Sequence, residues 1–150
     1  MKKYLLVLIA LTACTFAAQK ESYSYSSVGV DAPSLIPQFG YGYRLASGAT
    51  NAYDFSINYS TNLKESDITY HTKYVFCHQN SYIAIGQKID FSYWRTRRRL
   101  NYDLIFSAEV SVGIENEISF HQINICPISI NSYGDISRVP EVSYQYGMKF

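Results

Sequence analysis

The last nine residues of the chain alternate strictly between apolar and polar or small side chains, and this pattern constrains the fold more than any other feature. The alternate apolar positions are Val142, Tyr144, Tyr146, Met148 and Phe150. Successive side chains of a β-strand point to opposite faces, so the segment predicts a strand with one fully apolar face. We expect such a strand, which ends flush at Phe150, to close a barrel in lipid.

The same alternation recurs through the chain after residue 21, and no segment there has convincing helical periodicity. We predict eight strands, over about residues 22–30, 38–45, 53–59, 67–76, 82–93, 102–114, 118–126 and 142–150. Most have roughly 9–11 residues, the length with which a tilted strand crosses a bilayer. The first strand changes phase near residues 26–28, where we expect a bulge, and the seventh changes phase near residues 122–125.

An even number of strands places both termini at one end of a barrel. The connections after the second, fourth and sixth strands lie at that end and are short (47–51, 78–81 and 115–117). The other connections tend to be longer (31–37, 60–66, 94–101 and 127–141). Short periplasmic turns and longer outer loops are typical of outer-membrane barrels. The sequence therefore predicts an all-β fold, a single antiparallel up-and-down transmembrane β-barrel over residues 19–150.

Alternation alone does not show whether the apolar face of the barrel wall points outwards or inwards, because a soluble lipocalin-like barrel has its apolar face inside. Here the bulky residues concentrate on the apolar face, while the other face is rich in Gly and Ser. Rows of aromatic rings would overfill the narrow interior of eight strands. Tyrosines near strand ends also suit a membrane boundary: Tyr43, Tyr59, Tyr70, Tyr93 and Tyr102. These observations favour an apolar face in contact with lipid.

Charged residues on the small-residue face would then point into the lumen. They are Arg44, Asp54, Lys73, Lys88, Asp90, Asp103 and Glu109. We predict a lumenal network of ion pairs in which these side chains fill the barrel and leave no open pore. His71 and His121 are predicted to be ordinary lumenal residues.

The N-terminus is predicted to be a signal peptide over residues 1–18, with Lys2 and Lys3 before an apolar core of ten residues. Two cleavage sites remain open. Thr15-Phe16-Ala17 suits ordinary signal peptidase, whereas Leu11-Thr12-Ala13-Cys14 resembles a lipobox that would make Cys14 a lipidated first residue. Either implies export through the general secretory pathway.

One cluster of positive charge follows the fifth strand, in a predicted outer loop. It contains Trp94, Arg95, Arg97, Arg98 and Arg99. Guanidinium groups bind phosphate bidentately, so lipopolysaccharide or another anionic partner is one interpretation. A solvated strand end is the other.

Several function classes find no support. Without residues 1–18 the chain has 11 basic and 12 acidic residues, which gives no case for nucleic acid as a partner. No catalytic motif, cofactor motif or metal-ligand spacing is present, so we expect no enzyme activity, no cofactor and no metal. In the predicted topology Cys77 and Cys126 lie far apart, which argues against a disulfide.

The chain resembles small eight-stranded bacterial outer-membrane β-barrel proteins. The resemblance implies that the assembly machinery reads Tyr144, Tyr146, Met148 and Phe150, although Gly147 lies nearer the end than is typical. Residues 37–44 are also similar in texture to strands of uncharacterised outer-membrane proteins of the chlamydial lineage.

The resemblance implies a non-enzymatic protein of the cell outer membrane with a structural, adhesive or surface-protective role. Residues 31–37 and 127–141 are then candidate loops for a host or surface partner. The alternative is a soluble or lipid-tethered barrel of the periplasm or cell surface that binds a small apolar ligand inside.

Overall fold

A computed structural model describes residues 21–32, 35–62, 65–95 and 100–150, and the predicted signal peptide lies outside these ranges. The described residues form β1 (Tyr23–Ala32), β2 (Ile36–Ala46), β3 (Asn51–Thr61), β4 (Glu65–His78), β5 (Ser81–Arg95), β6 (Leu100–Glu115), β7 (Ser119–Asn131), β8 (Ile136–Ser137) and β9 (Glu141–Lys149). None of them belongs to a helix long and apolar enough to cross a membrane.

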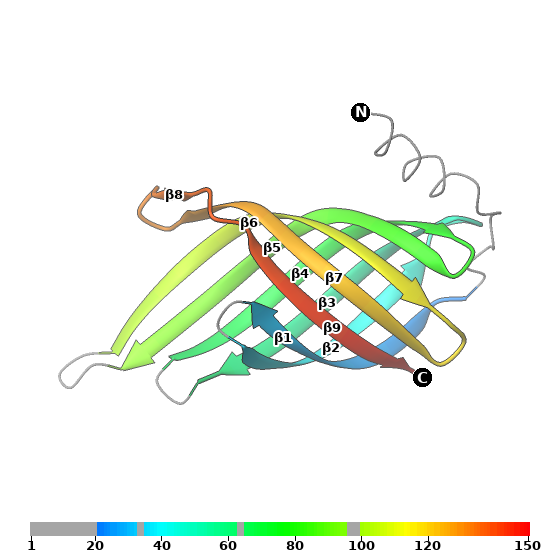
Figure 1. Cartoon of the computed structure of the whole chain (residues 1–150), viewed down its shortest axis with the longest axis horizontal. Helices are drawn as coiled ribbons and strands as arrows, with labels where there is room; N and C mark the ends of the chain where they lie inside the picture. The colour runs from blue at the N-terminus through cyan, green and yellow to red at the C-terminus, as the bar shows by residue number, and fades with distance from the viewer. Residues whose placement is uncertain (1–20, 33–34, 63–64, 96–99) are drawn as a thin grey trace.

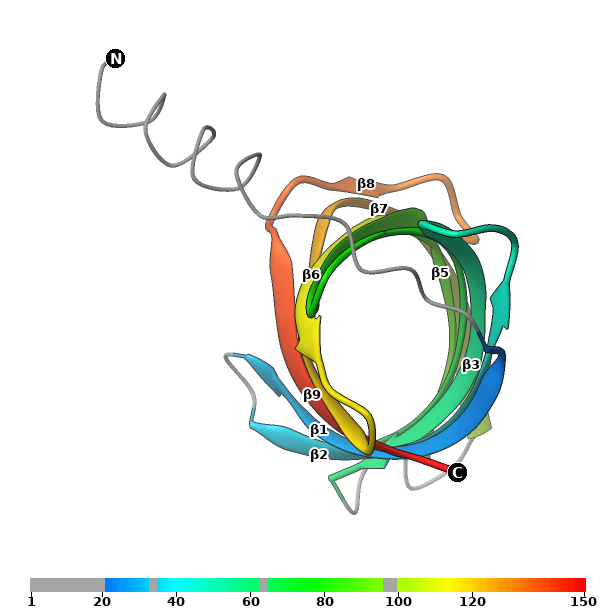
Figure 2. The same ribbon diagram turned by 90° about the vertical axis from the view of Figure 1, so that its right-hand side faces the viewer.

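Eight of these strands, β1–β7 and β9, form a closed antiparallel barrel (Figures 1 and 2). Each strand from β1 to β7 pairs with the next one in the chain, and β9 pairs with both β7 and β1. The β1–β9 seam extends from Tyr25 opposite Lys149 to Ala32 opposite Val142. The short β8 pairs with β7 only, so it lies outside the closed barrel.

The two ends of the barrel differ. The β2–β3, β4–β5 and β6–β7 hairpins and Phe150 lie at one end, which we call the turn end. The β1–β2, β3–β4 and β5–β6 connections and β8 lie at the other, the loop end. The expected contrast in connection length is only partly present, since just residues 33–35, 62–64 and 96–99 separate the strands at three loop-end connections. Only the β7–β9 connection is long.

The strands take up the residues that were predicted to be loops. β4, β5 and β6 have 14, 15 and 16 residues and extend at both ends beyond the predicted ranges 67–76, 82–93 and 102–114. β5 extends to Arg95 and β6 starts at Leu100, so residues 94, 95, 100 and 101 of the predicted basic loop belong to strands, and residues 96–99 lie outside the described ranges. Continued pairing of the polar residues explains this, because a β-ladder needs backbone partners and not an apolar side chain.

The predicted bulge in the first strand is absent. Tyr23 to Asp31 pair with β2 residue by residue, and the alternation is regular with Tyr25 inside the barrel. The prediction was wrong because it grouped tyrosine with lipid-facing residues. The Tyr25 hydroxyl donates a hydrogen bond of 2.6 Å to Asp54, which satisfies its polar tip inside the barrel.

The irregularity in the seventh strand also lies elsewhere. The β6–β7 register shifts between Ala108 and Val110, so Cys126 and Pro127 together oppose Glu109. Proline has no N–H to donate to a ladder and is therefore tolerated at a bulge. Residues 120–126 alternate regularly, with Phe120 inside and His121 outside, so the prediction that His121 is lumenal was wrong.

Candidate functional site

The lumen holds the polar half of the alternation. Arg44, Lys73 and Glu109 have 0%, 3% and 1% of their surface exposed, whereas most apolar side chains of the same strands point outwards. On β9, for example, Gln145 is buried between the exposed Tyr144 and the half-buried Tyr146. Buried charges are tolerated only with partners, and the lumenal charges among the described residues form three clusters of ion pairs and hydrogen bonds.

The turn-end cluster is centred on Arg44 of β2. Its Nη2 lies 2.7 Å from Asp54 Oδ2 on β3, and its Nη1 lies 2.9 Å from Glu115 Oε2 at the end of β6. Lys149 Nζ approaches the same Glu115 oxygen at 3.4 Å, and the Tyr23 hydroxyl donates to it at 2.9 Å. One guanidinium thus joins strands from opposite parts of the sequence across the lumen.

Aromatic rings fill the space around this guanidinium. The centre of the Tyr82 ring is 4.4 Å from Arg44 Cζ, within the range of a cation–π contact. Tyr25, Tyr82 and Phe120 each lie directly opposite a glycine on the paired strand: Gly42, Gly113 and Gly147. A Cβ at any of these glycines would collide with the ring. The lumen therefore holds aromatic bulk after all, in places that the glycines leave free.

A middle cluster lies deeper in the barrel. Glu109 of β6 forms an ion pair with Lys73, with 3.1 Å between Oε1 and Nζ. Its Oε2 lies 2.8 Å from His71 Nδ1. His71 Nε2 lies 3.1 Å from Asn58 Nδ2. Lys73 also donates to Asn124 of β7 at 3.0 Å, which links the two sides of the lumen. These contacts connect β3, β4, β6 and β7 through the lumen.

The loop-end cluster is more exposed. Lys88 pairs with Asp90 at 3.0 Å and with Glu141 at 2.8 Å. Asp103, which was expected in the network, lies at the rim, where Ser132 Oγ donates to it at 2.7 Å. No ion pair of Asp103 is found among the described residues.

The sequence did not indicate several members of these clusters: Tyr23, Tyr25, Tyr82, Glu115, Phe120 and Lys149. A pairing argument could have found three of them, because a large ring opposite a glycine on an adjacent strand fills the space that the glycine leaves. Glu115 was assigned to a turn, although it ends β6 and its carboxylate reaches back to Arg44.

The other candidate residues lie apart from the lumen. Trp94 is half-buried near the end of β5, while Arg97, Arg98 and Arg99 lie outside the described residues, as does Cys14. Tyr144, Met148 and Phe150 point outwards from β9 with 42%, 55% and 70% exposure, and Tyr146 on the same face is half-buried. In the described part of the chain no group of three or more His, Cys, Asp or Glu could hold a metal ion.

Both cysteines outside the predicted signal peptide are buried. Cys77 lies beside the β4–β5 turn, where it pairs with Tyr82, and Cys126 lies farther up the wall opposite Glu141.

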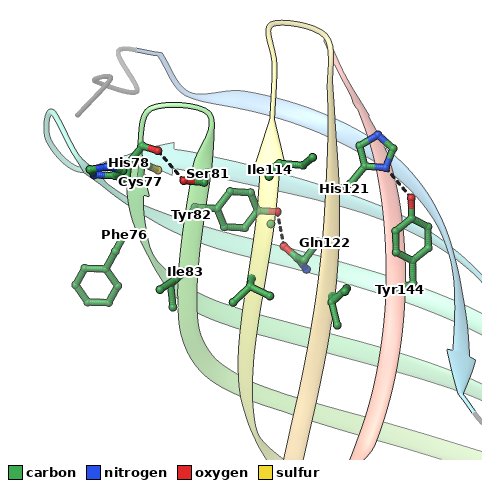
Figure 3. Close-up of a pocket in the computed structure, with 13 residues that line it drawn as sticks. Phe76, Cys77, His78, Ser81, Tyr82, Ile83, Ile114, His121, Gln122 and Tyr144 are labelled. Carbon is green, nitrogen blue, oxygen red and sulfur yellow. Dashed lines mark hydrogen bonds between the residues drawn. The ribbon is translucent and has the colours of Figure 1, made fainter. Parts of the chain in front are cut away.

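A hollow of about 560 Å³ lies at the turn end. Residues of five strands line it. Most of them point outwards, among them Phe76, Ile83, Val112, His121 and Tyr144, and the lining also includes the buried Cys77, Tyr82 and Gln122. His121 Nδ1 and the Tyr144 hydroxyl are 2.6 Å apart, and Figure 3 shows this pair and Phe76 on opposite sides of the hollow, with Ile83 between them.

These features define a closed eight-stranded antiparallel β-barrel with a charged, filled lumen and an apolar outer wall. The crystal structure of the N-terminal β-barrel domain of Pseudomonas aeruginosa OprF is similar to it, with a TM-score of 0.57 and 10% sequence identity over 89% of this chain and 99% of that domain. At this identity the likeness concerns the fold. No protein-family model and no curated protein matches the sequence. The resemblance to the chlamydial lineage has no support in these comparisons.

Proposed function

We propose that the protein is a non-enzymatic β-barrel of the cell outer membrane with a structural, adhesive or surface-protective role. The observation that carries the proposal is the polarity of the wall. Ile57, Ile85 and Phe39 have 52%, 56% and 60% of their surface exposed, while Arg44 and Asp54 are enclosed. In water this arrangement would expose the apolar surface and bury the charges, and both cost free energy. In a bilayer the apolar residues of the same wall face hydrocarbon, and the charges remain enclosed in the lumen.

The filled lumen supports a role without conduction. The Arg44 cluster with its three rings and the Glu109 cluster lie at different heights of the barrel, and each joins opposite sides of the wall. A wide aqueous path needs more strands than eight. We therefore expect the reconstituted barrel to give no stable conductance in planar bilayers.

The alternative, a soluble or lipid-tethered barrel with an apolar ligand inside, finds less support. Such a ligand needs a mostly apolar cavity. The lumen instead presents charged and amide side chains, including Lys73, Gln122 and Asn124.

The partners belong to the same proposal. Lipopolysaccharide or another anionic glycolipid would bind at Trp94, Arg95, Arg97, Arg98 and Arg99. The assembly machinery would read Tyr144, Tyr146 and Met148 on the outer face of β9, together with Phe150, which follows the strand. The exposed Tyr133, Ile136 and Val139 around β8 offer an apolar surface for a host or surface partner. Residues 1–18 would direct export, with lipidation at Cys14 as the alternative.

Fractionation and gel mobility test the proposal. An outer-membrane barrel sediments with the outer membrane, resists extraction by carbonate, and migrates differently in gels before and after boiling. Extraction by salt or carbonate alone would favour the soluble or tethered alternative. Mass spectrometry of the mature chain separates cleavage after residue 17 or 18 from a diacylglyceryl Cys14.

A further inference from the structure

The turn-end hollow combines an apolar floor with polar side chains at its edges, which are His78 and Ser81 beside the β4–β5 turn and the His121–Tyr144 pair on β7 and β9. Ile83, Val112 and Ile123 form part of the floor, on β5, β6 and β7. They belong to the outer wall, because each is about two-fifths exposed. The volume of about 560 Å³ lies within the range of roughly 300–1,000 Å³ that is usual for small-molecule sites.

The polar edge on β7 and β9 is the His121–Tyr144 pair. A histidine on a mostly apolar outer face needs a polar partner or a polar boundary. His121 and Tyr144 bond to each other through Nδ1 and the hydroxyl at 2.6 Å. His121 Nε2 has no hydrogen-bond partner among the described residues, so it can donate to or accept from a ligand.

The height of this pair on the wall agrees with a membrane boundary. His121 is the third residue of β7 from the turn end, and the Tyr146 ring packs beside it with centroids 5.0 Å apart. Tyr53, Tyr74 and Phe76 form a similar aromatic group on the neighbouring wall. Amphipathic rings gather where the hydrocarbon meets the headgroups.

We propose that the hollow binds one phospholipid of the leaflet at the turn end. An acyl chain covers Ile83, Val112 and Ile123, and the ester and glycerol oxygens contact the His121–Tyr144 pair. The inference rests on the proposed membrane location. Within a bilayer an apolar hollow that is continuous with the lipid-facing wall has no water to fill it, so a lipid chain is the occupant that matches its chemistry.

The test is native mass spectrometry of the full-length protein released from nanodiscs of phosphatidylethanolamine and phosphatidylglycerol. We expect the unaltered barrel to retain one phospholipid. Ile83→Trp fills the floor and should reduce retention about tenfold, whereas Ile85→Trp, on the same face of the same strand but outside the hollow, should retain it. Val112→Phe with Val110→Phe as its control repeats the comparison on β6, should a tryptophan impair folding.

A second comparison isolates the polar edge. Tyr144→Phe removes the hydroxyl and keeps the ring, so we expect retention to fall by about threefold to tenfold, the value of one hydrogen bond. Tyr70→Phe is the matched control, because Tyr70 has the same 42% exposure on the outer wall outside the hollow.

Equal retention by the Ile83 and Ile85 variants, or no retained lipid at all, would overturn the inference. Release of a dimer that Ile83→Trp dissociates would assign the hollow to a second copy and would overturn it too. Failure of the proposed membrane location would give a different result. Such a protein would show neither heat-modifiable gel mobility nor sedimentation with the outer membrane, and both are measured independently of lipid retention.

Discussion

Arg44 and Asp54 face each other on the neighbouring strands β2 and β3, with 2.7 Å between Nη2 and Oδ2 and 0% and 3% of their side chains exposed. The Arg44 side chain extends beyond this pair to Glu115 of β6. Arg44 therefore joins the first half of the barrel wall to the second. Substitutions of its partners can measure how much these ion pairs contribute to stability.

Asp54→Ala should destabilise the barrel by about 3–5 kcal/mol, because it leaves a buried guanidinium with half of its compensation. The measurement is urea unfolding of the barrel in lipid vesicles. Glu141→Ala is the control: its ion pair with Lys88 has the same order of length, 2.8 Å, but its side chain is 48% exposed. That variant should lose less than about 1 kcal/mol.

A double variant separates the burial of charge from the loss of a bond. In Arg44→Met combined with Asp54→Leu both charges are gone, and much of the stability lost in Asp54→Ala should return. A double variant that is as unstable as Asp54→Ala would show that an unpaired buried charge is not the cause of the loss.

Gly147→Ala should lower the free energy of unfolding by about 1–3 kcal/mol, because the new methyl group would occupy the space of the Phe120 ring. The gel temperature at which the folded form disappears is a convenient measurement. Gly48→Ala is the control, since it adds the same methyl group where nothing lies within 4 Å. Phe120→Leu in the Gly147→Ala chain should recover part of the loss, and equal behaviour of the two alanine variants would exclude the collision.

The strand pattern and the closure of the barrel could be predicted from the alternation. β3 and β9 show why, because each has one apolar face and an opposite face of polar or small residues. On β3 the apolar face consists of Tyr53, Phe55, Ile57 and Tyr59. Where a residue type fits both faces the prediction failed. Tyr25 has an apolar ring that suits lipid and a hydroxyl that suits Asp54, and only the position of Gly42 on the paired strand decides between them.

The ends of the strands were also beyond the pattern. Glu115 and Asp103 have similar carboxylates near the two ends of β6, yet one reaches Arg44 and the other bonds Ser132 at the rim. Which of them enters the lumen depends on strand tilt and register, and these follow from the pairing of all eight strands together. A local sequence pattern does not contain the pairing of the eight strands, so it cannot predict which carboxylate enters the lumen.

Reversal of charge at Arg97, Arg98 and Arg99 to glutamate should weaken the binding of lipopolysaccharide to the purified barrel. Guanidinium groups pair with phosphate, and glutamate repels it, so the remaining affinity should also lose its dependence on salt. Surface plasmon resonance at two salt concentrations measures both effects. Arg138→Glu is the matched control, an exposed arginine of the loop end next to β8. Unchanged binding by the triple variant would leave the cluster as a solvated strand end.

The orientation of the wall can be tested at a single position. Ile57 lies in the middle of β3 with 52% exposure, and arginine there would face the centre of a bilayer at a cost of about 2–4 kcal/mol. Ile57→Arg should therefore reduce insertion into vesicles and lower stability in them. Val139→Arg, at a loop-end residue with 75% exposure, should change neither. In a water-soluble barrel the exposed Ile57 would instead accept arginine with no loss and with a gain in solubility, which is the opposite of the result expected for a wall in lipid.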